Sequence, residues 1–260
     1  MKAPYVMPIN VGDMVWDHSE AVLRRGMGIK QKGNFICWFI GGTDVPILVD
    51  SGLPDEERAK KWHSYTNPTI SPEQRMENAL KRKGIDPESI KIVIQTHLHW
   101  DHTGNLKLFP NAQVIVTEEE LKYAINPLPI HYAAYEAFGS GLEPMWVGAM
   151  GQFKIIKMKE QEVATGVRII PTPGHTPGGI SIFLETADGP WVMAADNVMV
   201  SEALNPEPDK KLPFNISGVY TDLIAVWESI EKSLNLVGGD RKRILPGHDR
   251  LVFQQERYPK

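Results

Sequence analysis

The sequence predicts an α+β protein in which two β-sheets pack face to face around one core, with helices on the outside. Two observations favour this class: the first recognisable strands form a hairpin-like pair, and helices are then interposed among further strands before a last helix. A doubly wound parallel sheet is the competing interpretation, but it would need strand and helix to alternate throughout. The 260 residues contain no repeat, low-complexity tract or linker, so we expect a single domain over residues 1–260.

Local patterns assign the individual strands and helices. We expect strands where short apolar runs lie between turn signals, at 34–40, 45–50, 91–95, 114–116, 153–157, 168–172, 180–185, 191–195 and 243–245. We expect helices where capping residues or charged stretches mark them, at 54–63, 72–83, 118–124 and 223–236. The expected N-caps of the last three helices are Ser71, Thr117 and Asp222, and Gly84 is expected to end the second helix. The first two strands are joined by Gly-Gly-Thr-Asp, a hairpin signal.

Composition and charge exclude several classes of partner. A formal net charge of −4 gives no reason to expect nucleic acid, and no window is long and apolar enough to span a membrane. The N-terminus lacks the basic region and apolar core of a secretory signal. The single cysteine, Cys37, excludes an internal disulfide and a cysteine-rich zinc site, and its apolar surroundings predict a buried side chain. We therefore expect a cytoplasmic protein.

The segment 96–104, Thr-His-Leu-His-Trp-Asp-His-Thr-Gly, concentrates ligand-type side chains directly after a predicted strand. Side chains this close in sequence converge only where the backbone turns sharply, which Thr103 and Gly104 permit. Imidazole and carboxylate groups suit zinc and neighbouring divalent metals. The segment therefore predicts a metal site with the ligands His97, His99, Asp101 and His102.

Three more ligand-type residues stand at the ends of predicted strands, namely His175, Asp196 and His248. Each alone reads more simply as a loop residue that makes a local hydrogen bond, but their joint occurrence with the upstream motif favours one site. Together the seven ligands are too many for one tetrahedral ion and suit two ions with water between them. His18 and His63, in contrast, lie in polar surroundings with no partner motif.

In this order, the motifs resemble those of the metallo-β-lactamase superfamily: His-x-His-x-Asp-His at 97–102, Pro-Gly-His-Thr-Pro-Gly at 173–178, Asp196 and His248. The match spans nearly the whole chain. Within the superfamily, the segment 71–101 and the Gly-His-Asp tail at 247–249 are most similar to the N-acyl homoserine lactonase group. The resemblance implies a four-layer αβ/βα sandwich with the metals at one edge between the sheets.

The resemblance also implies a role for each ligand. One zinc would be bound by His97, His99 and His175, the other by Asp101, His102 and His248, and Asp196 would bridge them. Asp50 matches a family aspartate that supports the metal loop from behind, although a strand-end Asp-Ser-Gly by itself reads as an ordinary turn.

A pair of cations about 3.5–4 Å apart determines the expected chemistry. A water that bridges them loses a proton near neutral pH, which gives a hydroxide nucleophile without a dedicated catalytic base. Asp101 would then ligate a metal and orient this hydroxide. The sequence thus predicts a hydrolase that attacks the carbonyl of a small-molecule lactone or carboxylic ester. Its cofactors would be two Zn²⁺, with iron, manganese or cobalt as alternatives.

One position departs from the lactonase pattern. In that group a tyrosine follows the bridging aspartate by three positions and helps to hold the substrate carbonyl, whereas this chain has Met199 there. Methionine cannot donate a hydrogen bond, so the donor must come from elsewhere or be missing. Tyr220 is a candidate substitute, with a packing or surface role as the alternative.

The segment 126–150 is aromatic, rich in methionine, broken by proline and glycine, and nearly free of charge. Such insertions often act as lids or binding loops, so we expect a substrate wall. The same residues could instead pack against a second subunit in a homodimer.

Two alternative functions stay open. A thioester hydrolase resembling glyoxalase II shares the Thr-His-x-His-Trp-Asp-His motif, but such proteins usually carry a basic helical extension, and here the chain stops soon after His248. A non-hydrolytic iron enzyme of the same fold, doing redox or oxygen chemistry, would not need the complete second site.

Overall fold

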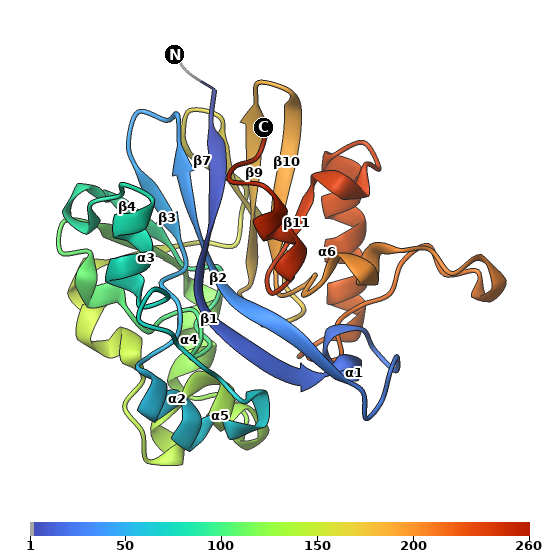
Figure 1. Cartoon of the computed structure of the whole chain (residues 1–260), viewed down its shortest axis with the longest axis horizontal. Helices are drawn as coiled ribbons and strands as arrows, with labels where there is room; N and C mark the ends of the chain where they lie inside the picture. The colour runs from blue at the N-terminus through green and yellow to red at the C-terminus, as the bar shows by residue number, and fades with distance from the viewer. Residues whose placement is uncertain (1–2) are drawn as a thin grey trace.

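The computed structural model describes residues 3–260, so the first two residues of the predicted domain lie outside the described part. Two β-sheets pack against each other at its centre, with an apolar cluster between them (Figure 1). Six strands form the first sheet in the order β1-β2-β3-β4-β5-β6, and five form the second in the order β11-β10-β9-β8-β7. The presence of two sheets excludes a single doubly wound sheet.

The strands are β1 (Tyr5–Asp17), β2 (Lys30–Gly41), β3 (Ile47–Val49), β4 (Ile92–Ile94), β5 (Gln113–Thr117), β6 (Phe153–Ile156), β7 (Gln161–Ala164), β8 (Val167–Pro171), β9 (Ile180–Thr186), β10 (Gly189–Ala195) and β11 (Ile244–Pro246). The helices are α1 (His18–Ala21), α2 (Glu56–Trp62), α3 (Met76–Arg82), α4 (Glu118–Ile125), α5 (Tyr132–Tyr135) and α6 (Leu223–Leu236). Short 3-10 turns join them.

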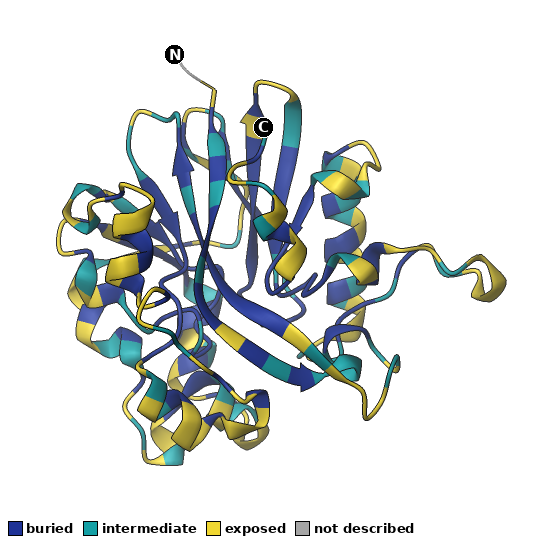
Figure 2. Cartoon of the chain, viewed as in Figure 1, coloured by how far each residue is buried: buried dark blue, intermediate teal, exposed yellow. Residues whose placement is uncertain are grey.

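Three apolar clusters hold four layers together. Between the sheets, residues such as Ile94 of β4 pack with Ile182 of β9. The outer face of the first sheet packs against α3, α4 and α5, with Leu80 among the buried residues. The outer face of the second sheet packs against α6 through Val226 and Ile230. Figure 2 shows most of the central strand residues buried and the outer sides of the helices exposed. The predicted α+β class and four-layer sandwich are confirmed.

Strand direction brings the ligand-bearing loops to one edge. In the first sheet β3, β4 and β5 are parallel, so Asp50 after β3 and the histidine motif after β4 leave the sheet on the same side. In the second sheet β10 and β11 are parallel, which places Asp196 and His248 together. Because β8 and β10 are both antiparallel to β9, the turn with His175 also leaves at this edge.

The hairpin predicted at 34–40 and 45–50 is confirmed, because β2 and β3 pair antiparallel. Two strands lie where none was predicted. In β1 the register shifts between Asn10 and Gly12, and this bulge breaks the alternation of buried and exposed residues that would reveal a strand. The strand β7 is short, polar and at the edge of its sheet.

The helix predicted at 72–83 begins later, at Met76. Ser71 closes a turn instead of capping the helix: its N–H donates to Gln74 Oε1 at 2.8 Å, and the Gln74 N–H donates to the Ser71 carbonyl at 3.0 Å. The cap at Asp222 is confirmed, because its carboxylate accepts from the N–H groups of Ile224 and Ala225 at 2.9 and 3.0 Å.

The structure also describes the single cysteine and the apolar character of the helices. Cys37 is free and fully buried, and burial raises the pKa of its thiol well above the usual value. Over residues 3–260, we find no helix whose length and apolar character would allow it to cross a membrane.

Candidate metal centre

The structure brings the seven predicted ligand residues together at the edge where the loops converge. Their ligand atoms form three overlapping groups, each with all atoms within 4.8 Å of one another: His97, His99 and His175; His97, His102 and Asp196; and Asp101, His102 and His248. The histidines and Asp196 are buried, whereas Asp101 is partly accessible.

Asp196 faces four imidazoles at the middle of the cluster. Its Oδ2 lies 3.0 Å from Nε2 of His248, and the Nε2 atoms of His175, His102 and His97 lie at 3.5, 3.6 and 3.9 Å. Burial alone would raise the pKa of Asp196, but the charges of His248 and His102 hold it well below its usual value. The carboxylate is therefore ionised and shared by both halves of the cluster.

Several buried polar atoms at this centre have no hydrogen-bond partner within residues 3–260. They are Nε2 of His97, Nε2 of His102 and Oδ1 of Asp196. An unpaired buried polar group costs about 1–3 kcal/mol, so a native fold retains such groups where something else satisfies them. Imidazole nitrogen and carboxylate oxygen are ligands for divalent metals, and the residues present fit such ions.

Backbone carbonyls orient two of the imidazoles. His248 Nδ1 donates to the Asn34 carbonyl at 2.9 Å, and His175 Nδ1 donates to the Val219 carbonyl at 2.9 Å. Because a carbonyl can only accept, the proton of each neutral ring must be on Nδ1. The unprotonated Nε2 of His175 then faces the centre, which is the form that binds a metal. Burial acts to lower the pKa of His248, but Asp196 and Asp101 raise it above the usual value, so His248 would have to give up its Nε2 proton to bind a metal.

Asp50 lies behind the histidine motif, as the resemblance implied. Its carboxylate accepts from the backbone N–H and the hydroxyl of Thr96, each at 2.8 Å, and from Nδ1 of His102 at 2.8 Å. Asp50 has a φ of 60°, an uncommon value for a residue with a side chain. The strain is retained where one carboxylate fixes both the start of the loop and one of its ligands.

Burial and neighbouring charges shift the pKa values of the histidines in opposite directions. Burial, with the adjacent imidazoles, lowers the pKa of His97 and His99 well below the usual value. Burial also acts to lower the pKa of His102, but Asp101, Asp50 and Asp196 outweigh it and raise that pKa well above the usual value. His97 and His99 are therefore neutral, the form that could bind a metal, whereas His102 would have to give up a proton to do so.

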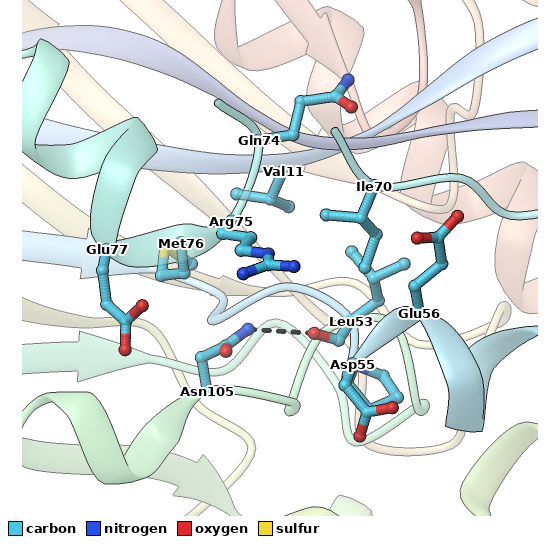
Figure 3. A pocket seen from close by; sticks show the side chains of 11 residues that line it. Val11, Leu53, Asp55, Glu56, Ile70, Gln74, Arg75, Met76, Glu77 and Asn105 are labelled. Carbon is cyan, nitrogen blue, oxygen red and sulfur yellow. Dashed lines mark hydrogen bonds between the residues drawn. The ribbon is translucent and has the colours of Figure 1, made fainter. Parts of the chain in front are cut away.

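The residues that follow the histidine motif form hydrogen bonds with the loop after β3. The Gly104 N–H donates to the Gly52 carbonyl at 2.6 Å. Asn105 Nδ2 donates to the carbonyls of Ser51 and Leu53 at 2.8 and 2.9 Å. Figure 3 shows the bond from Asn105 to Leu53 in a hollow of about 310 Å³, which none of the seven ligands lines.

A cavity of about 100 Å³ opens onto the cluster. It is lined by Met14, Trp16, Glu20, Phe35, Tyr65, Thr66, His99, Trp100, Asp101, Ala134, His175, Asp196, Met199, Val219 and His248. Pockets that enclose a drug-sized ligand typically measure about 300–1,000 Å³, so this one encloses little more than a reacting group.

Met199 lines this cavity, so the position of the missing tyrosine supplies no hydrogen-bond donor. Tyr220 packs against the apolar cluster beside α6, and its neighbour Val219 reaches the cavity instead. Within residues 3–260, the tyrosine that lines the cavity is Tyr65. The sequence showed no motif around it, because Tyr65 approaches the site from a 3-10 turn between two helices.

His63 is also placed differently from the prediction. It is fully buried, its ring stacks on Trp100 with 3.8 Å between centroids, and its Nε2 lies 3.1 Å from Glu136 Oε1. The prediction of polar surroundings is wrong for His63, because its ring is buried against Trp100. The sequence showed no partner motif because both partners are distant in sequence. His18 lies nearer the surface, with Nε2 3.2 Å from Glu202.

Comparisons with known proteins identify the family of the chain. A family model described as the metallo-beta-lactamase superfamily matches residues 37–248. The chain is 30% identical over 229 residues to an N-acyl homoserine lactonase from Bacillus sp, which covers 85% of this chain and 82% of the relative. It is 31% identical over 223 residues to N-acyl homoserine lactonase AiiA from Bacillus thuringiensis subsp. kurstaki, which covers 82% and 80%.

A solved structure of an N-acyl homoserine lactone hydrolase, with the product N-hexanoyl-L-homoserine bound at its catalytic metal center, has a TM-score of 0.76 to this chain. The two are 26% identical, and the match covers 98% of this chain and 96% of the other. These findings confirm the resemblance read from the motifs. The chain belongs to the metallo-beta-lactamase superfamily, and within it to the group that contains the N-acyl homoserine lactonases.

Proposed function

We propose that this protein is a dinuclear metal-dependent hydrolase that opens a small-molecule lactone, with a carboxylic ester as the related substrate. The observation that carries the proposal is the arrangement of seven ligand residues around the buried carboxylate of Asp196, whose Oδ1 has no other partner within residues 3–260. The names of the relatives, N-acyl homoserine lactonases, support a lactone as the substrate class.

Two zinc ions fit this set of nitrogen and oxygen ligands, with iron, manganese and cobalt as alternatives. We assign the first ion to His97, His99 and His175, the second to Asp101, His102 and His248, and the bridging position to Asp196. When bound, such a pair supplies the Lewis acidity that activates water and polarises a carbonyl.

The side chains around the ligands then position the reactants. Asp101 is partly accessible at the cavity, and its Oδ2 lies 3.6 Å from His102 Nε2. At this place its carboxylate can accept a hydrogen bond from a water molecule and orient that water. Apolar side chains, among them Trp16, Phe35 and Met199, form the walls. They suit an uncharged ring or acyl group.

We assign the hydrogen-bond donor that Met199 cannot provide to Tyr65. Tyr65 is 53% exposed as a whole, yet burial of its phenol, together with the charge of Asp101, raises its pKa to about 12. The hydroxyl therefore keeps its proton at neutral pH and can donate to a substrate oxygen.

A comparison of metal-loaded and chelated protein tests the proposed function. We expect about two zinc ions per chain after reconstitution, and hydrolysis of lactones in a panel that also contains thioesters, phosphodiesters and β-lactams. Chelation should abolish the activity and zinc should restore it. One iron per chain, or turnover of thioesters alone, would favour the alternative functions named above.

Replacing Tyr65 by phenylalanine should lower kcat/KM for a lactone about tenfold, the effect of losing one hydrogen bond of about 1.4 kcal/mol. Tyr220→Phe is the matched control, because that hydroxyl is attached to a ring packed beside α6. Steady-state kinetics of the two variants decide between the tyrosines. A loss confined to Tyr220→Phe would return the donor role to Tyr220.

We retain three further predictions from the sequence: a single domain, a cytoplasmic location and a wall formed by the segment 126–150. Ala134 of this segment lines the cavity and supports the wall. Leu128, Ile130 and Phe138 are exposed, so the same segment also offers an apolar surface to a second copy of the chain in a homodimer.

A further inference from the structure

Glu120 is a fully buried carboxylate that lies outside the ligand cluster and contacts three of the segments around it. It is in the first turn of α4. Its Oε1 accepts from the Leu98 N–H at 2.9 Å and from the Tyr135 hydroxyl at 3.0 Å. Its Oε2 accepts from the Gly178 N–H at 3.1 Å.

Two of these donors belong to the loops that carry the three-histidine group. Leu98 lies between His97 and His99, and Gly178 follows His175 in the same turn. The histidine motif follows a strand of the first sheet and the turn follows a strand of the second. The distance between these two loops is therefore set by tertiary packing. One carboxylate therefore spans the two loops that must meet around one ion.

The neighbouring Thr117 strengthens the same junction. Its hydroxyl donates to the Gly178 carbonyl at 2.7 Å and accepts from the Glu120 N–H at 3.2 Å. A side chain at Gly178 would overlap the Glu120 backbone nitrogen, so the turn lies directly against α4.

Burial raises the pKa of Glu120, and its hydrogen bonds from Leu98, Tyr135 and Gly178 act in the opposite direction. A buried carboxylate is costly unless donors converge on it, and each donor would be left unpaired without it. The group and its donors therefore hold one another in place.

The other ligand group depends on different contacts. His102 is oriented by Asp50 at 2.8 Å, and His248 by the Asn34 carbonyl at 2.9 Å. A change at Glu120 should therefore reach one half of the centre and leave the other half in place.

We infer that Glu120 is a positioning residue that holds the His97–His99 loop and the His175 turn at the separation required by the first metal ion. The inference rests on the proposed dinuclear function, because it states that Glu120 affects the binding of one of the two metal ions and not the other. Glu120 acts through the histidines and does not itself touch the metal or the substrate.

The test is a two-step zinc titration of the metal-free protein against a chromophoric chelator, repeated with Co²⁺ to record its visible absorption. Glu120→Gln keeps the volume but turns one acceptor into a donor, so a backbone N–H of Leu98 or Gly178 loses its partner. We expect the affinity of the first ion to fall about 10- to 100-fold, as for other groups that orient ligands, and the second step to stay in place. His175→Ala identifies which step belongs to the three-histidine group.

Glu136→Gln is the matched control, because Glu136 is a buried carboxylate bonded to Arg58 and His63. His63 stacks on Trp100 of the histidine motif, so this variant perturbs the motif without breaking the link to the His175 turn. If Glu120→Gln does not fold, Thr117→Val should show the same selectivity more weakly. Equal weakening of both steps, or none, would overturn the positioning role. Wild-type protein that binds fewer than two ions would instead contradict the proposed function itself.

Discussion

Asp101→Asn is expected to lower kcat/KM by at least about a hundredfold while the fold stays intact. The side chain of Asp101 is 12% exposed, and its Oδ2 lies 3.6 Å from His102 Nε2 and 3.7 Å from His248 Nε2. An amide keeps the volume but removes the charge that would bind a cation and orient water. Kinetics on the best lactone of the panel, with circular dichroism as the check on folding, measures the effect.

Asp44→Asn serves as the control for Asp101→Asn. Asp44 is exposed in the turn between β2 and β3, so the same loss of charge there should leave kcat/KM unchanged. Activity of Asp101→Asn equal to that of the wild type would remove Asp101 from the proposed site.

Gly247→Ala is expected to reduce both stability and metal binding. An added Cβ would overlap Asp196 Oδ1 and lie 3.1 Å from the carbonyl carbon and oxygen of Ala195. Asp196 cannot move aside freely, because it is buried and 3.0 Å from His248 Nε2. We expect a loss of about 1–3 kcal/mol of unfolding free energy, as for other overpacked sites, and fewer bound ions per chain.

Thermal unfolding and metal analysis of Gly247→Ala are best compared with Gly151→Ala. An added Cβ at Gly151 meets nothing within 4 Å, so that variant reports the general effect of replacing glycine by alanine. Similar behaviour of the two variants would show that the space beside Asp196 is not needed.

The strands that are buried almost throughout were predicted from the sequence. The strands β3, β4 and β9 are buried almost throughout and read as apolar runs in the sequence. The strand β1 is thirteen residues long and remained undetected, because its bulge shifts which residues face the core. The edge strand β7 buries little, so its sequence carries little apolar signal.

The ligands could be predicted because metal binding demands rare residue types at specific places. Histidine and aspartate at the ends of apolar strands, as in His97 to His102, are conspicuous in a single sequence. Asp50 required the family resemblance, because a strand-end Asp-Ser-Gly also suits a simple turn. Its contact with His102 crosses from one strand of the sheet to the next.

The sequence by itself determined the class of fold, the seven ligand types and the family, since each depends on local composition and on the order of motifs along the chain. Only the tertiary structure decided that Tyr65 faces the cavity, that His63 stacks on Trp100 and that Glu120 joins two loops. Each of these contacts links residues from separate elements, and one tyrosine, histidine or glutamate looks like any other along the chain. The physical reason is that packing brings such residues together at distances that no local pattern encodes.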